Sequence, residues 1–285
     1  MNFMAHAAAH GLLIETLIAD GRWHRSRTED KPRKKNGAYV FDGERGAVIN
    51  FATMVHAASF RPDGRVEQID RAAIRKMQAE HARQERERQS DARCKAEDMI
   101  KAASFSTHPY LTAKGFPLEQ GLVLNGELLI PMREFTLYRQ INSVQRISAD
   151  GSKLFLQGGK AKGSVFFIGP MVPRERWLVE GYATALSVRA ALRELHRDAQ
   201  VIVCFSASNL SHVGRLAKNL RPQSYVFADN DKSGAGAKAA EETGLPWVMA
   251  EAEGYDANDV HREFGVRPLA ALLTQYRNRR NEEAA

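Results

Sequence analysis

Two groups of acidic residues follow apolar stretches of the chain, and their chemistry points to a bound cation. Glu180 ends the run WLVE, and Asp229 and Asp231 end the run SYVFADND. Carboxylates brought close together repel one another unless a cation neutralises them. Oxygen-only ligands favour a hard ion, so the expected cofactor is Mg²⁺ or Mn²⁺. Such an ion accepts phosphate oxygens and stabilises a leaving oxygen, which is the chemistry of phosphoryl transfer.

The segments that must position these carboxylates alternate between strand and helix from residue 176 onward. Apolar runs typical of strands span 177–180, 200–206, 224–231 and 246–252, and helical patterns such as 182–196 separate them. This alternation predicts an α/β domain with a four-stranded parallel sheet and flanking helices. Because function gathers at the carboxyl ends of parallel strands, Glu180 should share one edge with the aspartates. Alternation along an extended strand further predicts that Asp229 and Asp231 point to one side.

The acidic pattern also has a purely structural interpretation. An isolated Asp-x-Asp is common, and acidic residues after strands often cap the next helix. The combination is more specific, because Glu180-Gly181 follows one buried strand and Asp-x-Asp follows a later strand of the same unit. A further group, Asp256-Ala-Asn258-Asp259, follows the fourth strand and is expected to join the same acidic edge.

The motifs WLVEGYATALSV, VIVCFSASNL and YVFADNDKSGAG, in this order, resemble those of a Toprim domain. Bacterial-type primases, topoisomerases and some nucleases share this domain, and the resemblance spans about residues 174–265. It implies that Glu180 is the general acid/base and that Asp229 and Asp231 are metal ligands. Asp259, in YDANDV, resembles a trailing acidic motif of primase-helicase relatives from mobile elements. The expected metal ligands are therefore Glu180, Asp229, Asp231 and Asp259.

The region upstream narrows the expected reaction. LLIPMREF and INSVQRISADGSKLFLQGGKAKGSVFFIG are similar to the segment that precedes Toprim in bacterial-type and plasmid- or phage-encoded primases. The resemblance implies that Arg146, Lys153 and Lys160 guide template and nucleotides. The residues themselves agree in part, since a Gly-rich turn that carries Lys160 and Lys162 can bind phosphate. A plain basic hairpin is the structural alternative.

The chain of 285 residues divides into four expected parts. A small N-terminal α+β domain is expected at 1–65, a charged helical connector at 66–103, a basic α+β region at 104–173, and the Toprim domain with a C-terminal helix at 174–285. The connector has no Pro or Gly and mixes both charge signs, which is typical of a solvated helix. Within the first part, residues 1–20 are expected to form an amphipathic helix rather than a signal peptide. The cytoplasm is therefore the expected location.

The N-terminal motifs DGRWHR and KKNGAYVFD are similar to the start of plasmid and phage primase-like proteins. Many primases carry a zinc ribbon at this place, but this segment has no cysteine, and His24 and His56 alone cannot make a structural zinc site. No zinc is therefore expected. Trp23 and Tyr39 can stack on nucleic-acid bases or form the core of the small domain. At least one of them is expected to be core.

These observations together predict a primase or primase-like protein of a plasmid, phage or related mobile element. It would make RNA primers for DNA replication from NTPs on a single-stranded DNA template, as a Mg²⁺-dependent, DNA-binding nucleotidyltransferase. A replicative helicase is an expected partner, and no membrane is. The net charge of +7 fits a polyanionic partner without requiring one. A Toprim nuclease and a non-catalytic single-stranded DNA-binding accessory with a vestigial site remain the alternatives.

Overall fold

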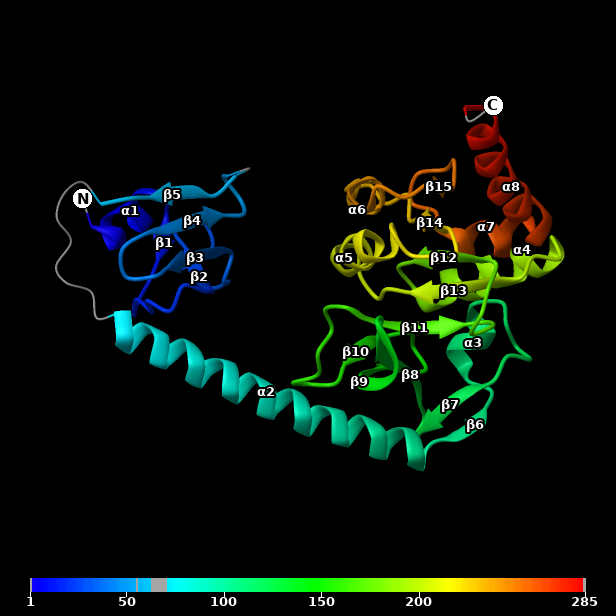
Figure 1. The fold of residues 1–285 in the computed structure, drawn as a ribbon, viewed down its shortest axis with the longest axis horizontal. Coiled ribbons are helices and arrows are strands. Elements are labelled where there is room, and N and C mark those ends of the chain that lie inside the picture. Colours follow the sequence, from blue (N-terminus) through cyan, green and yellow to red (C-terminus); the bar gives the residue numbers. More distant parts are fainter. Residues whose placement is uncertain (1, 55, 63–70, 284–285) are drawn as a thin grey trace. The chain divides into compact units, whose positions relative to one another are not determined.

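The computed structural model describes residues 2–54, 56–62 and 71–283 and divides the chain into two compact units. The units are Met1–Glu87 and Arg88–Ala285, and the long helix α2 (Arg71–Ala102) belongs to both (Figure 1). The predicted connector is thus a helix over most of its length, and its first five residues, 66–70, lie outside the described residues. The expected part boundaries at 65, 103 and 173 stay predictions.

Apart from its part of α2, the first unit consists, in the described residues, of one short helix and one antiparallel sheet, as expected for a small α+β domain. The five strands are hydrogen-bonded in chain order, from β1 to β5. The elements are α1 (Phe3–Ala9), β1 (Leu12–Leu13), β2 (Trp23–Thr28), β3 (Gly37–Phe41), β4 (Gly46–Asn50) and β5 (Ala58–Phe60). Helix and sheet enclose an apolar core that includes Phe3, Leu12, Tyr39, Val48 and Phe60.

The predicted helix over residues 1–20 is wrong beyond Ala9. The chain leaves α1 through Gly11, whose positive φ of 71° is easy for glycine, and then forms β1. Leu12 pairs with β2 and is 2% exposed. A longer helix would remove Leu12 from this buried position beside the sheet. Tertiary packing therefore overrides the local helical pattern.

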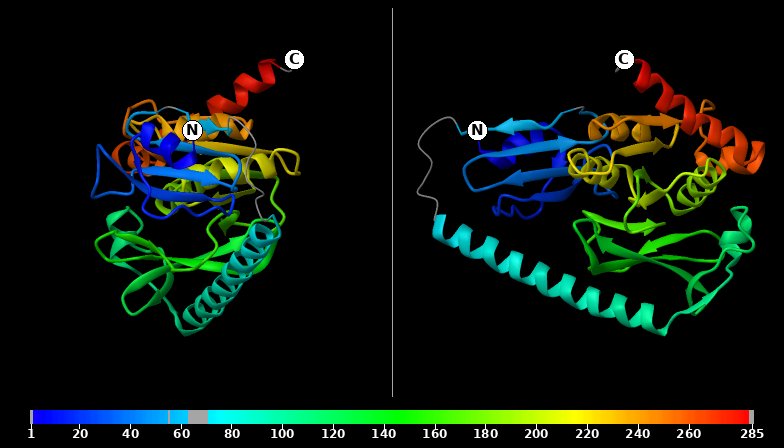
Figure 2. Two further views of the ribbon diagram at one scale, coloured as in Figure 1. Left: turned by 90° about the vertical axis from the view of Figure 1, so that its left-hand side faces the viewer. Right: turned by 45° about the vertical axis from the view of Figure 1, so that its right-hand side comes forward.

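The second unit is built on one mixed sheet of ten strands. Their order is β10-β9-β8-β11-β13-β12-β14-β15, with β7 paired to β8 and β6 to β7. The strands are β6 (Ser104–Ser106), β7 (Gly121–Leu124), β8 (Glu127–Glu134), β9 (Leu137–Ile147), β10 (Lys153–Phe155), β11 (Ser164–Ile168), β12 (Glu175–Val179), β13 (Ala199–Val203), β14 (Ser224–Ala228) and β15 (Trp247–Met249). Figure 2 shows the green antiparallel strands beside the yellow and orange part of the sheet.

The predicted four-stranded parallel sheet is confirmed. Strands β13, β12, β14 and β15 run parallel, and β11 joins them to the antiparallel strands. The helices of this unit are α3 (Pro109–Ala113), α4 (Tyr182–Glu194), α5 (Ala207–Ala217), α6 (Ala235–Thr243), α7 (Ala257–Phe264) and α8 (Val266–Glu283). Within the described residues, no helix has the length and apolar character that crossing a bilayer requires.

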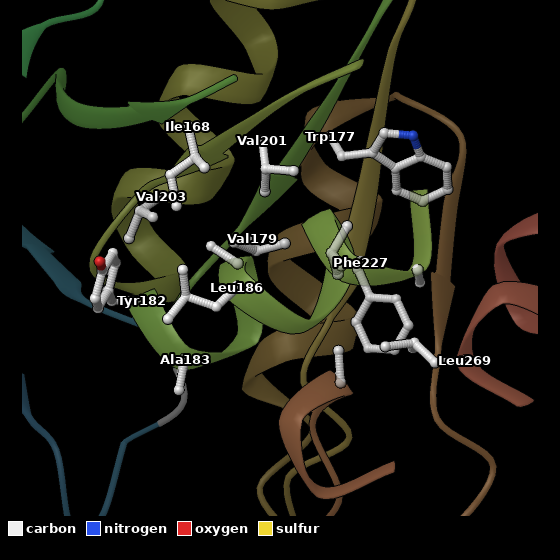
Figure 3. Close-up of a cluster of buried hydrophobic side chains, with 14 of the residues drawn as sticks. Ile168, Trp177, Val179, Tyr182, Ala183, Leu186, Val201, Val203, Phe227 and Leu269 are labelled. Carbon is white, nitrogen blue, oxygen red and sulfur yellow. The ribbon is translucent and has the colours of Figure 1, made fainter. Parts of the chain in front are cut away.

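Helices cover both faces of the parallel strands, so these strands are apolar on both sides. All five residues of β12 are buried, and they alternate between two cores. Trp177 and Val179 belong to the core that includes α4, α7 and α8, together with Leu186 and Leu269 (Figure 3). Leu178 belongs to the opposite core, which α5 and α6 cover.

The packing predicts a large loss of stability when Leu186 is shortened. Leu186 is 1% exposed in the core of α4, so Leu186→Ala leaves a cavity and should lower the free energy of unfolding by about 2–5 kcal/mol. Chemical unfolding followed by circular dichroism measures this. Leu220→Ala is the control, since Leu220 is 46% exposed and its loss should change stability by less than about 1 kcal/mol. Equal effects of the two variants would contradict this assignment of the core.

Candidate active site

The pairing of β12 with β14 brings the two acidic groups to one edge of the sheet. Leu178 lies opposite Val226 in this parallel pair. Two residues further along this register, Glu180 follows the end of β12 at the level of Ala228, the last residue of β14, and Asp229 comes next. The predicted convergence at the carboxyl edge therefore follows from strand register alone.

The backbone after β14 differs from the expectation. The strand ends at Ala228, so the predicted alternation through Asp231 is wrong. The side-chain amide of Asn230 instead donates to the carbonyl oxygens of Ala250 at 3.0 Å and Ala252 at 3.2 Å, across the loop that follows β15. Asn230 is thus a structural anchor that holds the turn between the two aspartates.

Asp229 is a buried carboxyl group with one unsatisfied oxygen. Within the described residues, its Oδ1 is buried and has no hydrogen-bond partner. Burial raises the pKa of Asp229 to about 7, and the carboxylates of Asp256 and Glu180 add to the effect, while Lys153 opposes it. A group in this environment releases its proton readily only when a cation takes the proton's place.

Asp231 has the opposite environment. Its carboxylate accepts hydrogen bonds from the hydroxyl and the backbone N–H of Ser233 and from the backbone N–H of Gly236, at the start of α6. These bonds, with that from Ser233 first, lower the pKa of Asp231 to about 2. Gly236 is required here, since a Cβ on it would overlap the carbonyl oxygen of Asp229. Asp231 is therefore ionised at neutral pH and firmly placed.

Glu180 lies between these extremes. Burial raises the pKa of its carboxyl, and the charge of Asp231 acts in the same direction. A backbone hydrogen bond from Ala207, the first residue of α5, and the ammonium of Lys153 act against it. A partly buried glutamate with a raised pKa is suited to proton transfer near neutral pH.

Lys153 is the predicted basic residue that faces the carboxylates. It comes from β10, and its Nζ lies 5.8 Å from the centroid of the Tyr110 ring. Burial and the ammonium of Lys114 lower the pKa of Lys153, while the carboxylates of Asp256, Asp229 and Glu180 raise it. The residue as a whole is exposed, and the Tyr110 ring covers one side of its ammonium. Its role in binding nucleotides stays a prediction.

The other two predicted basic residues are engaged in ion pairs with β8. Arg146 Nη1 lies 3.4 Å from Glu127 Oε2, and Lys160 Nζ lies 2.6 Å from Glu134 Oε2. A phosphate bound by either side chain would compete with its glutamate. Their assignment to template or nucleotide binding also stays a prediction.

The trailing acidic motif forms a helix cap. The Asp256 carboxylate accepts from the backbone N–H groups of Asn258 and Asp259, and the Asp259 carboxylate accepts from the backbone N–H of Asp256 at 3.1 Å. Asp256 Oδ2 also accepts from the Thr184 hydroxyl at 2.9 Å, and Asp256 is the neighbour that adds most to the raised pKa of Asp229. The spacing Asp-x-x-Asp before a helix is a recognisable capping signal that sequence reasoning missed. Metal binding by Asp259 stays a prediction.

The donor set fits a hard cation held by few protein ligands. Within the described residues, no three His, Cys, Asp or Glu side chains are gathered closely enough to form a metal cage. Mg²⁺ needs only one or two carboxylates, because water and phosphate oxygens complete its shell. The unpaired buried oxygen of Asp229 and the ionised Asp231 meet that need, and Glu180 lies within their electrostatic reach.

Comparison with known protein families identifies the domain that contains the parallel strands. Residues 175–266 match the family model of the Toprim domain. This part of the chain belongs to the Toprim family. The match contains β12, β14 and the carboxylates of Glu180, Asp229, Asp231, Asp256 and Asp259, so the acidic edge of the candidate active site lies within a Toprim domain.

Solved structures with some likeness to the chain include three of primases. The DnaG catalytic core has 15% identity and a TM-score of 0.40, over 53% of this chain and 53% of that one. The primase fragment of the bacteriophage T7 primase-helicase has 19% identity and a TM-score of 0.40, over 53% and 65%. A DNA primase domain from Pseudomonas aeruginosa has 18% identity and a TM-score of 0.36, over 63% and 58%. The chain thus spans about half the length of the first of them.

The contrast between Asp229 and Asp231 predicts opposite effects on stability in the absence of metal. The pKa of Asp229 is higher in the folded chain than in the unfolded one, so its ionisation costs stability progressively as pH rises from about 4 to about 7. In EDTA at pH 8, Asp229→Asn should raise the free energy of unfolding by roughly 1–3 kcal/mol, and this gain should shrink as pH falls to 4.

Asp231→Asn is the matched variant. The lowered pKa of Asp231 means that its stabilisation is present above about pH 4 and is lost only as pH falls towards 2. The variant should therefore be less stable than the wild type at pH 8, because the cap of α6 is weakened. Thermal melts across this pH range measure both effects, and a destabilised Asp229→Asn at pH 8 in EDTA would contradict the environment described here.

Proposed function

We propose that this chain is a primase or primase-like nucleotidyltransferase that synthesises RNA primers from NTPs on single-stranded DNA. The observation that carries the proposal is the buried, unpaired oxygen of Asp229 beside Glu180 and Asp231, at the carboxyl edge of a Toprim sheet. A plasmid, phage or related mobile element is the proposed source, and a replicative helicase the proposed partner. Both rest on the sequence resemblance stated above.

The chain's own residues divide the work of nucleotidyl transfer. Asp229 and Asp231 would hold Mg²⁺, with Glu180 close to it and Asp259 joining only if its bond to the Asp256 backbone opens. When bound, the ion would lower the pKa of an attacking 3′-hydroxyl and neutralise the charge of the triphosphate. Glu180 would accept the proton of that hydroxyl as the new bond to the α-phosphorus forms, and pyrophosphate would leave with the electrons of the broken bond.

The basic residues would serve the phosphates. Lys153 faces the carboxylates, so its ammonium is well placed to contact a triphosphate that has been brought there by a metal ion. Arg146 and Lys160 would bind template or nucleotide phosphates in exchange for Glu127 and Glu134.

Primer synthesis provides the direct test. Wild-type protein, single-stranded DNA, labelled NTPs and Mg²⁺ should yield short RNA products that EDTA abolishes. Asp229→Asn and Glu180→Gln should each reduce the rate at least about a hundredfold, since each removes a group that acts on the reacting atoms. Glu194→Gln is the control, because this exposed glutamate at the end of α4 pairs only loosely with Arg267, at 3.4 Å.

The same reactions separate the alternatives. Strand cleavage that requires Mg²⁺ and Asp229 but no NTPs would replace the proposal with a Toprim nuclease. Metal-dependent products of neither kind, with DNA binding unchanged in Asp229→Asn, would show a non-catalytic binding protein instead.

The two lysines provide a second test. Lys153→Gln should reduce kcat/KM for NTPs by about tenfold or more, because the charge of Lys153 interacts with those of Asp256, Asp229 and Glu180. Lys160→Gln should have a smaller effect, because Glu134 already neutralises Lys160 at 2.6 Å. Initial rates over a range of NTP concentrations measure both, and a larger effect of Lys160→Gln would contradict the ranking.

A further inference from the structure

Helix α1 packs on one face of the N-terminal sheet, and the opposite face carries several exposed side chains. Side chains alternate along β2, so Trp23, Arg25 and Arg27 share one side, and Ser26 and Thr28 lie buried on the other. Cross-strand pairing extends the same side over the sheet: Trp23 lies opposite Val40 in β3, Arg25 opposite Ala38, and Arg27 opposite Leu13 in β1. Ile49 of β4 lies opposite Ala38 on the same side. We call this side, with Phe51 just after β4, the open face.

The opposite side is the core of the unit. Tyr39 and Val48 lie opposite one another on that side and pack against Phe3 of α1. Tyr39 is 3% exposed, and its hydroxyl bonds the backbone at Thr16 and Ile18. The core is therefore complete without any contribution from the open face.

Two aromatic rings on the open face are unusually accessible. Trp23 is 54% exposed and Phe51 is 49% exposed. The guanidinium of Arg25 lies over the Phe51 ring, 4.6 Å from its centroid, which presents a second flat, cationic surface. Aromatic rings and stacked guanidinium groups are the surfaces on which unpaired nucleic-acid bases stack.

The charge around these rings has the sign of a phosphate-binding surface. Between residues 22 and 35 the chain has seven basic side chains, and all are exposed: Arg22, Arg25, Arg27, Lys31, Arg33, Lys34 and Lys35. Only Glu29 and Asp30 oppose them in this stretch. This excess of positive charge complements a polyanionic partner such as a nucleic acid.

A cavity opens beside the open face. It has a volume of about 440 Å³, and its lining includes the apolar Leu13 and Ile14, the basic Arg25, Arg27 and Lys35, and the acidic Glu15. Its apolar residues can contact the flat side of a base, and Arg25 and Lys35 can contact the adjoining phosphates. Arg27 Nη1 lies 3.1 Å from Glu15 Oε1, so a phosphate would replace that carboxylate as its partner.

From this geometry we propose that the open face binds single-stranded nucleic acid. Bases stack on Trp23 and on the Arg25–Phe51 pair, and one base enters the cavity, while Arg27 and the basic segment 31–35 contact phosphates. A duplex would engage the charges only, because its bases are already stacked. The site is separate from the Toprim carboxylates and does not depend on catalysis there.

Binding by the full-length chain tests the proposal. Labelled oligonucleotides of single-stranded DNA, single-stranded RNA and duplex DNA are titrated in EDTA without NTPs and followed by fluorescence anisotropy. Single strands should bind more tightly than duplex. Trp23→Ala and Phe51→Ala should each weaken single-strand binding about tenfold or more, and Arg25→Ala at least as much. All three side chains are exposed, so circular dichroism and melting temperature should stay unchanged.

The chain supplies matched controls. Phe105→Ala removes an aromatic side chain that is 67% exposed on β6, and Arg267→Ala removes an exposed charge on α8; both should bind as the wild type does. Intrinsic fluorescence adds a direct readout. Of the three tryptophans, Trp177 is fully buried and Trp247 is half-buried on β15, so most of the quenching by single strands should be lost in Trp23→Phe.

The outcomes distinguish this proposal from the catalytic one. Unchanged binding in Trp23→Ala and Phe51→Ala, or equal affinity for duplex and single strands, would overturn the open-face site whatever the catalytic result. Binding that persists in Asp229→Asn but is lost in Trp23→Ala supports the site even if no primer is made.

Discussion

The structure of the candidate site depends on one electrostatic constraint, the charge that Asp229 holds at the edge of a buried sheet. Parallel strands covered on both faces force the residue after β14 into a poorly hydrated position. Asp256, Glu180 and Asp231 then add three further carboxylates, and the ammonium of Lys153 opposes them. Such an edge is stable as a proton-sharing cluster or as a cation site, and not as a set of free anions.

Asp229 and Asp231 belong to the same Asp-x-Asp motif, but their carboxyl groups have opposite environments. Asp231 is compensated by the start of α6, whose N–H groups and Ser233 hydroxyl stabilise its charge. Asp229 has no such donors for Oδ1 within the described residues. One carboxylate is thus a fixed anchor and the other a site that responds to what binds, a division of roles suited to a metal that must accept and release phosphate groups.

Sequence reasoning succeeded where burial dictates pattern and failed where distant loops intervene. The apolar runs around Trp177 and Phe227 are short and alternate with helical patterns, which favours strands covered on both faces, so the parallel sheet and its acidic edge were predictable. The end of β14 was not, because Asn230 bonds to carbonyls near Ala250 that no local pattern identifies. The approach of Lys153 also depends on long-range pairing through β8, β9 and β11.

The N-terminal unit combines a well-packed core on one side of its sheet with exposed aromatic and basic side chains on the other. Its core is aromatic: Phe3 stacks on Phe41 at 4.4 Å and meets Phe60 edge-on at 5.5 Å. These rings bury large areas per residue, which a unit of this size needs when its own sequence lacks cysteine ligands. Because side chains alternate along β2, the residues that face α1 stabilise the core, while Trp23 and Arg25 lie exposed on the opposite face. Trp23 and Phe51 contribute nothing to that core, and their exposure together with the stacked guanidinium of Arg25, among seven basic side chains, is what favours a ligand at this surface.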